Sequence, residues 1–291
     1  MNITNPITSN LIEKILKYNP LYILWFIVNF TVCWQLLGGG TELFFFLLVA
    51  YIISIWVALS PAGERLLRLI ESARPILTKQ EREYLDFIFE EVYSSVKAQH
   101  PYIGNVKLYL QDIMSVNAFA IGSHTIILTK GAVATFSEDE LRGILAHEFG
   151  HIVHGDTIAV LLNTVGNGFF AIFICLFRII STAIEILTGT FERSGFIKSL
   201  FKVTRIFLDM LIMFFMFIGQ AILSMNSRKS EFLADQFAYE TGYGSELVSA
   251  LYLFQRMSLS EKMTVKERLQ ATHPIFAWRI NKMETLIDGE M

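Results

Sequence analysis

Residues 147–151 read His-Glu-Phe-Gly-His, and this order brings two imidazoles and a carboxylate onto one stretch of a predicted helix. Residues four apart share a helical face, so the rings of His147 and His151 can both reach one metal ion. Imidazole nitrogen suits zinc, whose catalytic sites combine three protein ligands with an open position for water. Glu148 can accept a proton from that water, and the pattern therefore predicts a hydrolytic zinc site.

A third ligand must come from another element, and residues 227–235 offer one. Glu231 and Asp235 are again four apart and share a predicted helical face. Glu231 can complete a two-histidine, one-carboxylate site that holds one Zn²⁺ per chain. Asp235 can accept the spare N–H of a liganding histidine. Alone, such a pair of acidic residues is usually a solvated helical face; beside His147 and His151 it favours the ligand interpretation.

The helix around the first motif has clear start and end signals. Ser137 and Glu140 form a predicted capping box, and Gly155 is the predicted end. A series of apolar residues recurs at helical spacing on a face adjoining the histidines: Leu141, Ile144, Leu145, Phe149 and Ile152. We therefore expect a buried amphipathic helix that carries both histidines.

These motifs, in this order, resemble the HtpX-type integral-membrane zinc peptidases, which are related to the C-a-a-X prenyl proteases. The matching stretches are 147–151, Gly155-Asp156, and Ser227-Arg228 followed by Glu231, Ala234 and Asp235. The resemblance runs from about residue 60 to the C-terminus. It implies a zincin-like catalytic domain in which a glutamate from a second helix is the third zinc ligand.

Two further stretches extend the resemblance. Asn117-Ala118-Phe119-Ala120 resembles the family's N-A-x-A edge strand, which implies that a substrate lies along these residues. Thr272-His273-Pro274 with Arg279 resembles its T-H-P…R element, which implies a place near the active site. His273 or Arg279 can stabilise the oxyanion or hold a substrate carbonyl. Alternatively, His273 caps a turn, and Arg279 is a solvated helical residue or a partner of Asp235.

The three other histidines outside these motifs are assigned structural roles. His100 follows a predicted helix and precedes Pro101, where a cation near a helix end is a sufficient explanation. His124 is expected in a turn after Gly122-Ser123. His154 is three residues from His151, but three ligands are already assigned.

Composition points to a membrane protein that does not bind nucleic acid. Hydrophobic residues make up 53% of the 291 residues, and 25 residues are phenylalanine. A net charge of −3 and the lack of a basic aromatic motif argue against a nucleic-acid partner. The two cysteines, Cys33 and Cys175, lie in apolar runs and are interpreted as buried small side chains.

Four uncharged runs are each close to the length of about 20 residues that crosses a bilayer. They cover residues 18–41, 43–63, 157–177 and 210–227. The first two predict a retained N-terminal hairpin. Basic residues flank this hairpin on one side only, at Lys14, Lys17, Arg65, Arg68, Arg74 and Lys79. This charge bias predicts a cytoplasmic catalytic domain.

The second pair of runs leaves two arrangements open. A spanning hairpin would carry Arg193 and the basic residues of 198–205 to the outside, against the charge bias. Lys198, Lys202 and Arg205 also lie opposite an apolar face, which is typical of a helix lying in the membrane interface. We favour the hairpin.

The remaining pattern predicts a mainly α membrane protein with about four transmembrane helices and a small α+β catalytic domain. A capping box at Thr78 and Glu81 starts a helix, and strands are predicted at Val106–Leu110, Val116–Ala120 and Thr125–Thr129. The expected divisions are 1–63 (hairpin), 64–156 (first catalytic part), 157–227 (membrane-associated hairpin) and 228–291 (second catalytic part).

The expected activity is that of a membrane-bound zinc endopeptidase, with polypeptides as substrates and the lipid bilayer as its surroundings. The resemblance implies quality control of misfolded or damaged membrane proteins at the cytoplasmic face, most simply at a bacterial inner membrane. Two other functions stay open: C-terminal processing of prenylated proteins, and a non-catalytic membrane chaperone. Glu148 beside a complete ligand set favours catalysis over the chaperone.

Overall fold

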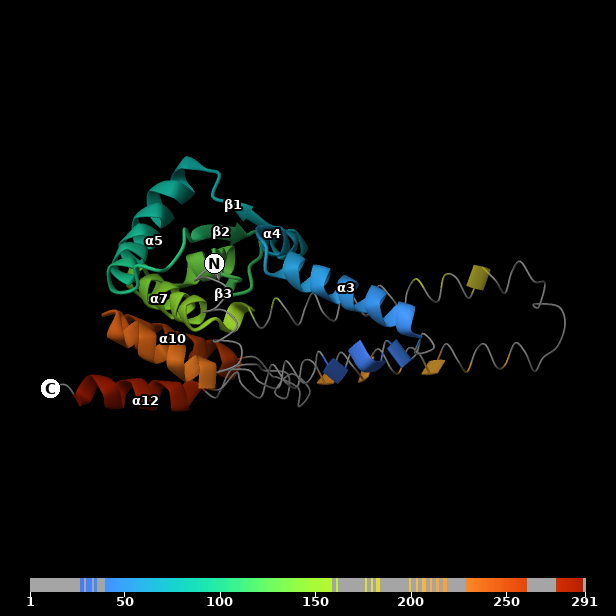
Figure 1. The fold of residues 1–291 in the computed structure, drawn as a ribbon. Coiled ribbons are helices and arrows are strands. Elements are labelled where there is room, and N and C mark those ends of the chain that lie inside the picture. The colour runs from blue at the N-terminus through green and yellow to red at the C-terminus, as the bar shows by residue number, and fades with distance from the viewer. Residues whose placement is uncertain are drawn as a thin grey trace, which may run out of the picture.

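The computed structural model describes residues 40–158, 229–260 and 276–289, together with isolated residues within 27–35 and 161–218. The predicted apolar runs 18–41, 157–177 and 210–227 lie outside the described residues for most of their length, and the basic segment 198–205 is described only at residues 199 and 203. The described residues form a four-stranded sheet with helices on both faces, and one long helix that projects away from this body (Figure 1).

The sheet comprises β1 (Ala73–Pro75), β2 (Lys107–Gln111), β3 (Ala118–Ile121) and β4 (Thr125–Thr129), in the order β1-β2-β4-β3. β2 and β4 are parallel, whereas β1 and β3 join antiparallel to β2 and β4. β4 has its predicted bounds, while β2 and β3 begin slightly later than predicted. Within the described chain β3 pairs only with β4, so it is an edge strand, as expected.

One face of the sheet packs against α5 (Lys79–Gln99) and α7 (Glu138–His154). Both helices begin with the predicted capping boxes, and α7 ends at Gly155 in the left-handed conformation, also as predicted. Phe149 of α7 is fully buried and stacks with Tyr93 of α5. The predicted apolar face of α7 therefore forms the centre of the core, which fixes the rotation of the helix and the direction of its histidines.

On the side of α7 away from the sheet, α10 (Gly244–Ser260) packs against α7, and α12 (Phe276–Asp288) packs against α10 (Figure 1). α10 comes close to α7 because Gly143 has no side chain; a Cβ atom there would overlap the backbone of Leu247. The short α6 (Lys130–Thr135) connects β4 to α7 and is capped by Thr129.

The opposite face of the sheet packs against α4 (Pro61–Ile70) and the C-terminal end of α3 (Thr41–Ala58), whose remainder projects away from the body (Figure 1). The run 43–63 was predicted as one continuous apolar segment, but the helix breaks between Ala58 and Pro61. Ser60 accepts a hydrogen bond from the Ala62 N–H, and Pro61 occupies the first helical position, where its missing N–H costs nothing. The sequence therefore starts a new helix here.

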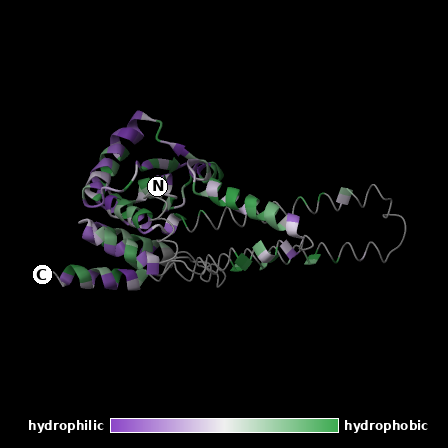
Figure 2. Ribbon diagram, in the orientation of Figure 1, coloured by the Kyte–Doolittle hydropathy of each residue, from purple (hydrophilic) through white to green (hydrophobic). Residues whose placement is uncertain are grey.

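α3 is apolar along most of its length (Figure 2). Among the described residues no single helix passes a test of length and hydropathy for crossing a membrane, whereas the stretches Phe44–Ala58 and Pro61–Ile70 pass it together, bent by 74°.

Candidate metal centre

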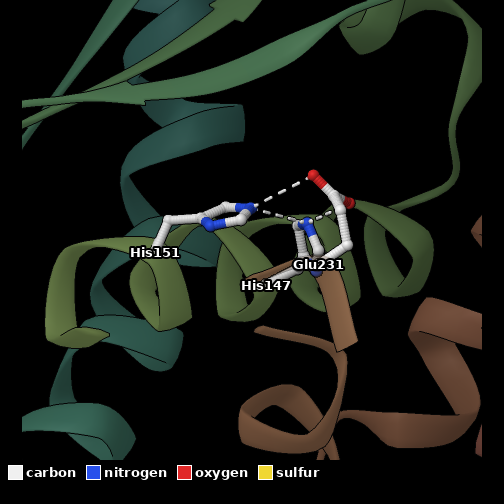
Figure 3. Close-up of side chains that lie close together, drawn as sticks. All are labelled: His147, His151 and Glu231. Atoms are coloured by element: carbon white, nitrogen blue, oxygen red, sulfur yellow. Dashed lines mark hydrogen bonds and ion pairs between the residues drawn. The ribbon is translucent and has the colours of Figure 1, made fainter. Parts of the chain in front are cut away.

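Three side chains from two distant parts of the chain meet at one point (Figure 3). His147 and His151 extend from α7, and Glu231 extends from the helical segment that the structure describes over 229–240. The two Nε2 atoms are 3.2 Å apart, and the Glu231 carboxylate oxygens lie 3.5 Å from His147 Nε2 and 3.7 Å from His151 Nε2. The sequence thus predicted correctly which residues come together.

The two ligand-bearing helices approach closely because Gly150, which has no side chain, lies at the point where they cross. A Cβ atom at Gly150 would lie 2.9 Å from the Ala234 Cα and 3.1 Å from the Phe237 Cβ. Ala234 and Phe237 are themselves buried in the interface. Glycine and alanine at this crossing therefore bring Glu231 within reach of the two histidines.

A carboxylate lies behind each imidazole ring. Asp235 Oδ1 is 2.9 Å from His147 Nδ1, as its position in the motif suggested. Asp156 Oδ2 is 3.2 Å from His151 Nδ1, a contact that the spacing did not predict. Asp156 reaches His151 because Gly155 adopts the left-handed conformation, which folds the chain back toward the end of α7.

These contacts test whether the three residues suit a metal ion. Each Nδ1 that donates to a carboxylate leaves an Nε2 lone pair directed at the same point as Glu231. A tetrahedral zinc ion with bonds of about 2.0–2.1 Å separates its ligand atoms by about 3.3–3.4 Å. The two Nε2 atoms are 3.2 Å apart, and one Glu231 oxygen lies 3.5 Å from His147 Nε2 while the other lies 3.7 Å from His151 Nε2, so the donor atoms are close to that spacing.

Arg279 of α12 closes the back of the centre. Its Nε and Nη2 donate to the two Asp235 oxygens at 2.8 and 2.6 Å, and its Nη1 lies 2.7 Å from Glu231 Oε2. The side chain is 4% exposed. Of the interpretations open for Arg279, the structure shows the partnership with Asp235, in the bidentate geometry that favours arginine.

The electrostatic environment of the centre favours a bound cation. Burial and the Arg279 charge lower the pKa of His147, but hydrogen bonds to Asp235 and Glu231 raise it by more, to about 9. The two carboxylates therefore favour a positive charge at this position. A metal ion supplies such a charge in place of a proton.

The remaining predicted site residues are placed as follows. Glu148 is buried in α7. Burial lowers the pKa of Arg279, whereas the charges of Asp235 and Glu231 raise it, and the charge of Glu148 adds a smaller increase. Ala118, Phe119 and Ala120 lie in β3, which packs against α7, and Asn117 directly precedes that strand. Residues 261–275, which include His273, lie outside the described chain.

The other described histidines take structural positions. His100 is the C-cap of α5, and His124 lies in the β3–β4 turn, where Glu64 contacts its Nδ1 at 3.1 Å. His154 is the last residue of α7 and is not part of the cluster around Glu231.

The chain is similar to several known proteins. A model of peptidase family M48 matches residues 79–287. Protease HtpX of Pseudomonas syringae pv. syringae is 28% identical over 70% of this chain, and the match covers 64% of that protein, less than two thirds of its length. A protease HtpX homologue of Methanothermobacter thermautotrophicus is 27% identical over 83% of this chain and 82% of its own. The crystal structure of S. mikatae Ste24p covers 97% of this chain and 63% of its own, with 20% identity and a TM-score of 0.49.

The family match covers both ligand-bearing helices, α12 and the whole sheet except β1. It agrees with the geometry of the three converging side chains and with the donors that zinc prefers. The chain is an HtpX-like member of peptidase family M48, a family of zinc metallopeptidases.

Proposed function

We propose that this protein is a membrane-bound zinc endopeptidase in which His147, His151 and Glu231 hold one zinc ion. The observation that carries the proposal is the convergence of these three side chains, whose ligand atoms all lie within 4.8 Å of one another. A structural role alone would not require two imidazole lone pairs and a buried carboxylate to face one point.

Glu148 is the proposed general base. Bound zinc would lower the pKa of a coordinated water and polarise the scissile carbonyl. Glu148 follows His147 directly in α7, so its carboxylate can take the water proton and pass it to the leaving amine. Its burial, with 6% of the residue exposed, keeps competing water away from this proton transfer.

The substrate is proposed to bind as an extended chain along β3. The outer edge of β3 has no strand neighbour among the described residues, and its backbone can pair with a peptide. Ala118 and Ala120 point toward the core that includes α7, and their small side chains allow the strand to lie close to the helix. A peptide paired with this edge would pass over the metal ligands.

Exposed apolar surface supports a membrane location. α3 exposes Phe45, Phe46, Val49, Ile52, Ile53 and Trp56. α4 buries Glu64 and Leu67 against the domain and exposes Leu66, Leu69 and Ile70. This distribution is the reverse of that on a water-facing helix, because the outer face is the apolar one. We propose that α3 enters the bilayer and that α4 lies at its surface.

Misfolded or damaged membrane proteins are the proposed substrates, cleaved at the cytoplasmic face. The charge bias around the first two apolar runs supports the orientation, and the resemblance to HtpX-type peptidases supports the substrate class. Both ligand-bearing helices adjoin predicted apolar runs, at 157–177 and 210–227, so a site on these helices would meet chains in, or leaving, the membrane.

The test uses full-length protein reconstituted in lipid vesicles. We expect an unfolded membrane protein in the same bilayer to be cleaved faster than a soluble unfolded protein, with Glu148→Gln inactive on both. Equal rates on the two substrates would refute the membrane preference. Selective cleavage of a prenylated C-terminal peptide would instead identify the alternative processing function.

Orientation is tested in intact cells with single cysteines at Gln80 and Thr285, both exposed, on a cysteine-free background. We expect an impermeant maleimide to label them only after permeabilisation. Labelling of both in intact cells would refute the cytoplasmic orientation.

A further inference from the structure

We propose that Glu64 of α4 is a positioning residue that holds the substrate edge strand β3 in place over the metal centre. This inference rests on the proposed function, in which β3 binds the substrate. Glu64 belongs to none of the zinc-site motifs, and it lies on the face of the sheet opposite α7. It is nevertheless buried, with 6% of the residue exposed.

The Glu64 carboxylate binds Ser123 and His124 of the β3–β4 turn and Thr125, the first residue of β4. Its Oε1 accepts a hydrogen bond from the Ser123 backbone N–H at 2.7 Å and lies 3.1 Å from His124 Nδ1. Its Oε2 accepts from the Thr125 hydroxyl at 3.2 Å. Arg68, one turn further along α4, donates to the same hydroxyl at 2.7 Å. Both carboxylate oxygens therefore have polar partners in this part of the chain, and these contacts compensate the cost of burying the charge.

A second contact fixes the turn from another side. The Thr157 hydroxyl donates to the Gly122 carbonyl, and both groups are buried. Gly122 has a φ of +59°, and a Cβ atom there would overlap the Glu64 side chain. Glycine at this position therefore allows both a left-handed turn and the close approach of the carboxylate.

This turn helps to position β3, because the strand is short and lies at the edge of the sheet. β3 is four residues long and pairs only with β4 within the described chain. Its two faces pack on α7 and on α4. Losing the contact from α4 leaves the strand held by one ladder and one helix, and an edge strand with weak support frays.

The same turn is adjacent to the metal centre. Thr157, which binds the Gly122 carbonyl, directly follows Asp156, the carboxylate behind His151. Glu64 on one side and the Asp156-Thr157 pair on the other therefore set the spacing between β3 and the metal ligands. The distance between a bound peptide and the zinc site depends on this arrangement.

The test compares Glu64→Met, which keeps the shape but removes both acceptors, with Glu64→Gln, which retains one carbonyl oxygen. Glu71→Gln at the other end of α4 is the matched control. KM and kcat are measured for a long fluorogenic peptide and for a truncated one too short to pair along β3. Zinc content, thermal unfolding and amide hydrogen exchange in β3 are measured on the same samples.

We expect Glu64→Met to raise KM for the long peptide about tenfold, with kcat and zinc content retained and the truncated peptide unaffected. Exchange in β3 should accelerate, and Glu64→Gln should recover most of the wild-type KM. An unchanged KM would overturn the proposal, and so would equal losses of kcat for both peptides, which would mean general destabilisation.

Failure of the proposed function gives a different result. A wild-type protein that cleaves neither peptide would refute the endopeptidase assignment. Hydrogen exchange then decides the structural part of the inference, since unchanged protection of β3 in Glu64→Met would show that Glu64 does not hold the strand. If Glu64→Met does not fold, the Glu64→Gln variant is measured instead. A KM and a rate of hydrogen exchange in β3 that are identical to those of wild type would overturn the proposal. Partial changes in both quantities would support it.

Discussion

At the scale of residues, the metal centre is a set of paired charges around two imidazoles. The spacing of His147, His151 and Glu231 predicted the cluster because helical periodicity alone places such residues on one face. The roles of Asp156 and Arg279 could not be derived in the same way. Asp156 acts through a turn, and Arg279 comes from a helix whose packing only the tertiary structure fixes.

Arg279 is expected to act on zinc affinity rather than on the reacting atoms. Its guanidinium neutralises Asp235 and Glu231, so Arg279→Gln removes the partner that aligns Asp235 behind His147 and the ligand Glu231 in front of it. Such outer partners typically contribute about 10- to 100-fold to metal affinity. We expect a loss in this range, measured by zinc competition with a chromophoric chelator. Unchanged affinity with a lower kcat would contradict this role and indicate contact with the oxyanion.

The contact between His124 and Glu64 predicts a pH-dependent stability. The hydrogen bond to Glu64 raises the pKa of His124 above 6.5, against smaller opposing effects of burial and of Arg68. A histidine whose pKa is raised by folding stabilises the fold fully below about pH 6.5, and this stabilisation is lost as pH rises through the raised pKa.

The measurement is the difference in unfolding temperature between wild type and His124→Asn, between about pH 5.5 and 9. We expect the difference to be largest at the acidic end and to shrink as pH rises; other histidines titrate in both proteins and cancel. A difference that grows with pH would have the wrong sign for this interaction.

At the scale of elements, the predictions succeeded where local signals act alone. The capping boxes of α5 and α7 were each predicted from two residues, and the end of α7 was predicted from Gly155 alone. The three-residue strand β1 and the helix α4 were not predicted. β1 forms only because β2 offers a partner, and the signal at Ser60-Pro61 was concealed in an otherwise apolar run.

Gly150 is expected to control the spacing of the two ligand-bearing helices. Alanine in a helix interior normally stabilises by about 0.5–1 kcal/mol relative to glycine. Here the added Cβ would meet the Ala234 Cα at 2.9 Å, and overpacking of this kind costs about 1–3 kcal/mol. Gly150→Ala should therefore lower both the unfolding temperature and the zinc content.

Gly40→Ala is the matched control, because no atom lies within 4 Å of a Cβ at that position. Thermal unfolding and metal analysis are compared for the two variants. A Gly150→Ala protein with wild-type zinc content and a raised unfolding temperature would show that the helices are not in close contact.

At the scale of the whole molecule, the site joins three parts of the chain that are far apart in sequence. α7 supplies two histidines, the segment 229–240 supplies Glu231, and α12 supplies Arg279. The sheet lies between these helices and the apolar pair α3 and α4 (Figure 1). This layering places the proposed substrate strand between the metal centre and the proposed membrane surface.

The exposed face of α4 is expected to contact lipid. A nitroxide label at Leu69→Cys, a position that is 70% exposed, should be relaxed more by oxygen than by a water-soluble nickel chelate in reconstituted vesicles. A label at Glu83→Cys on α5 is the control and should show the opposite preference. Equal accessibility of both labels to the nickel chelate would mean that α4 faces water.

The most direct test of the zinc assignment is the ratio of zinc to protein, measured with peptide cleavage on the same purified samples. Wild type and Glu148→Gln should each contain one zinc ion per chain, and only wild type should cleave, because glutamine preserves the site but cannot accept the proton. The double variant His147→Ala, Glu231→Ala should contain none. A full complement of zinc in the double variant, or near-wild-type cleavage by Glu148→Gln, would contradict the account.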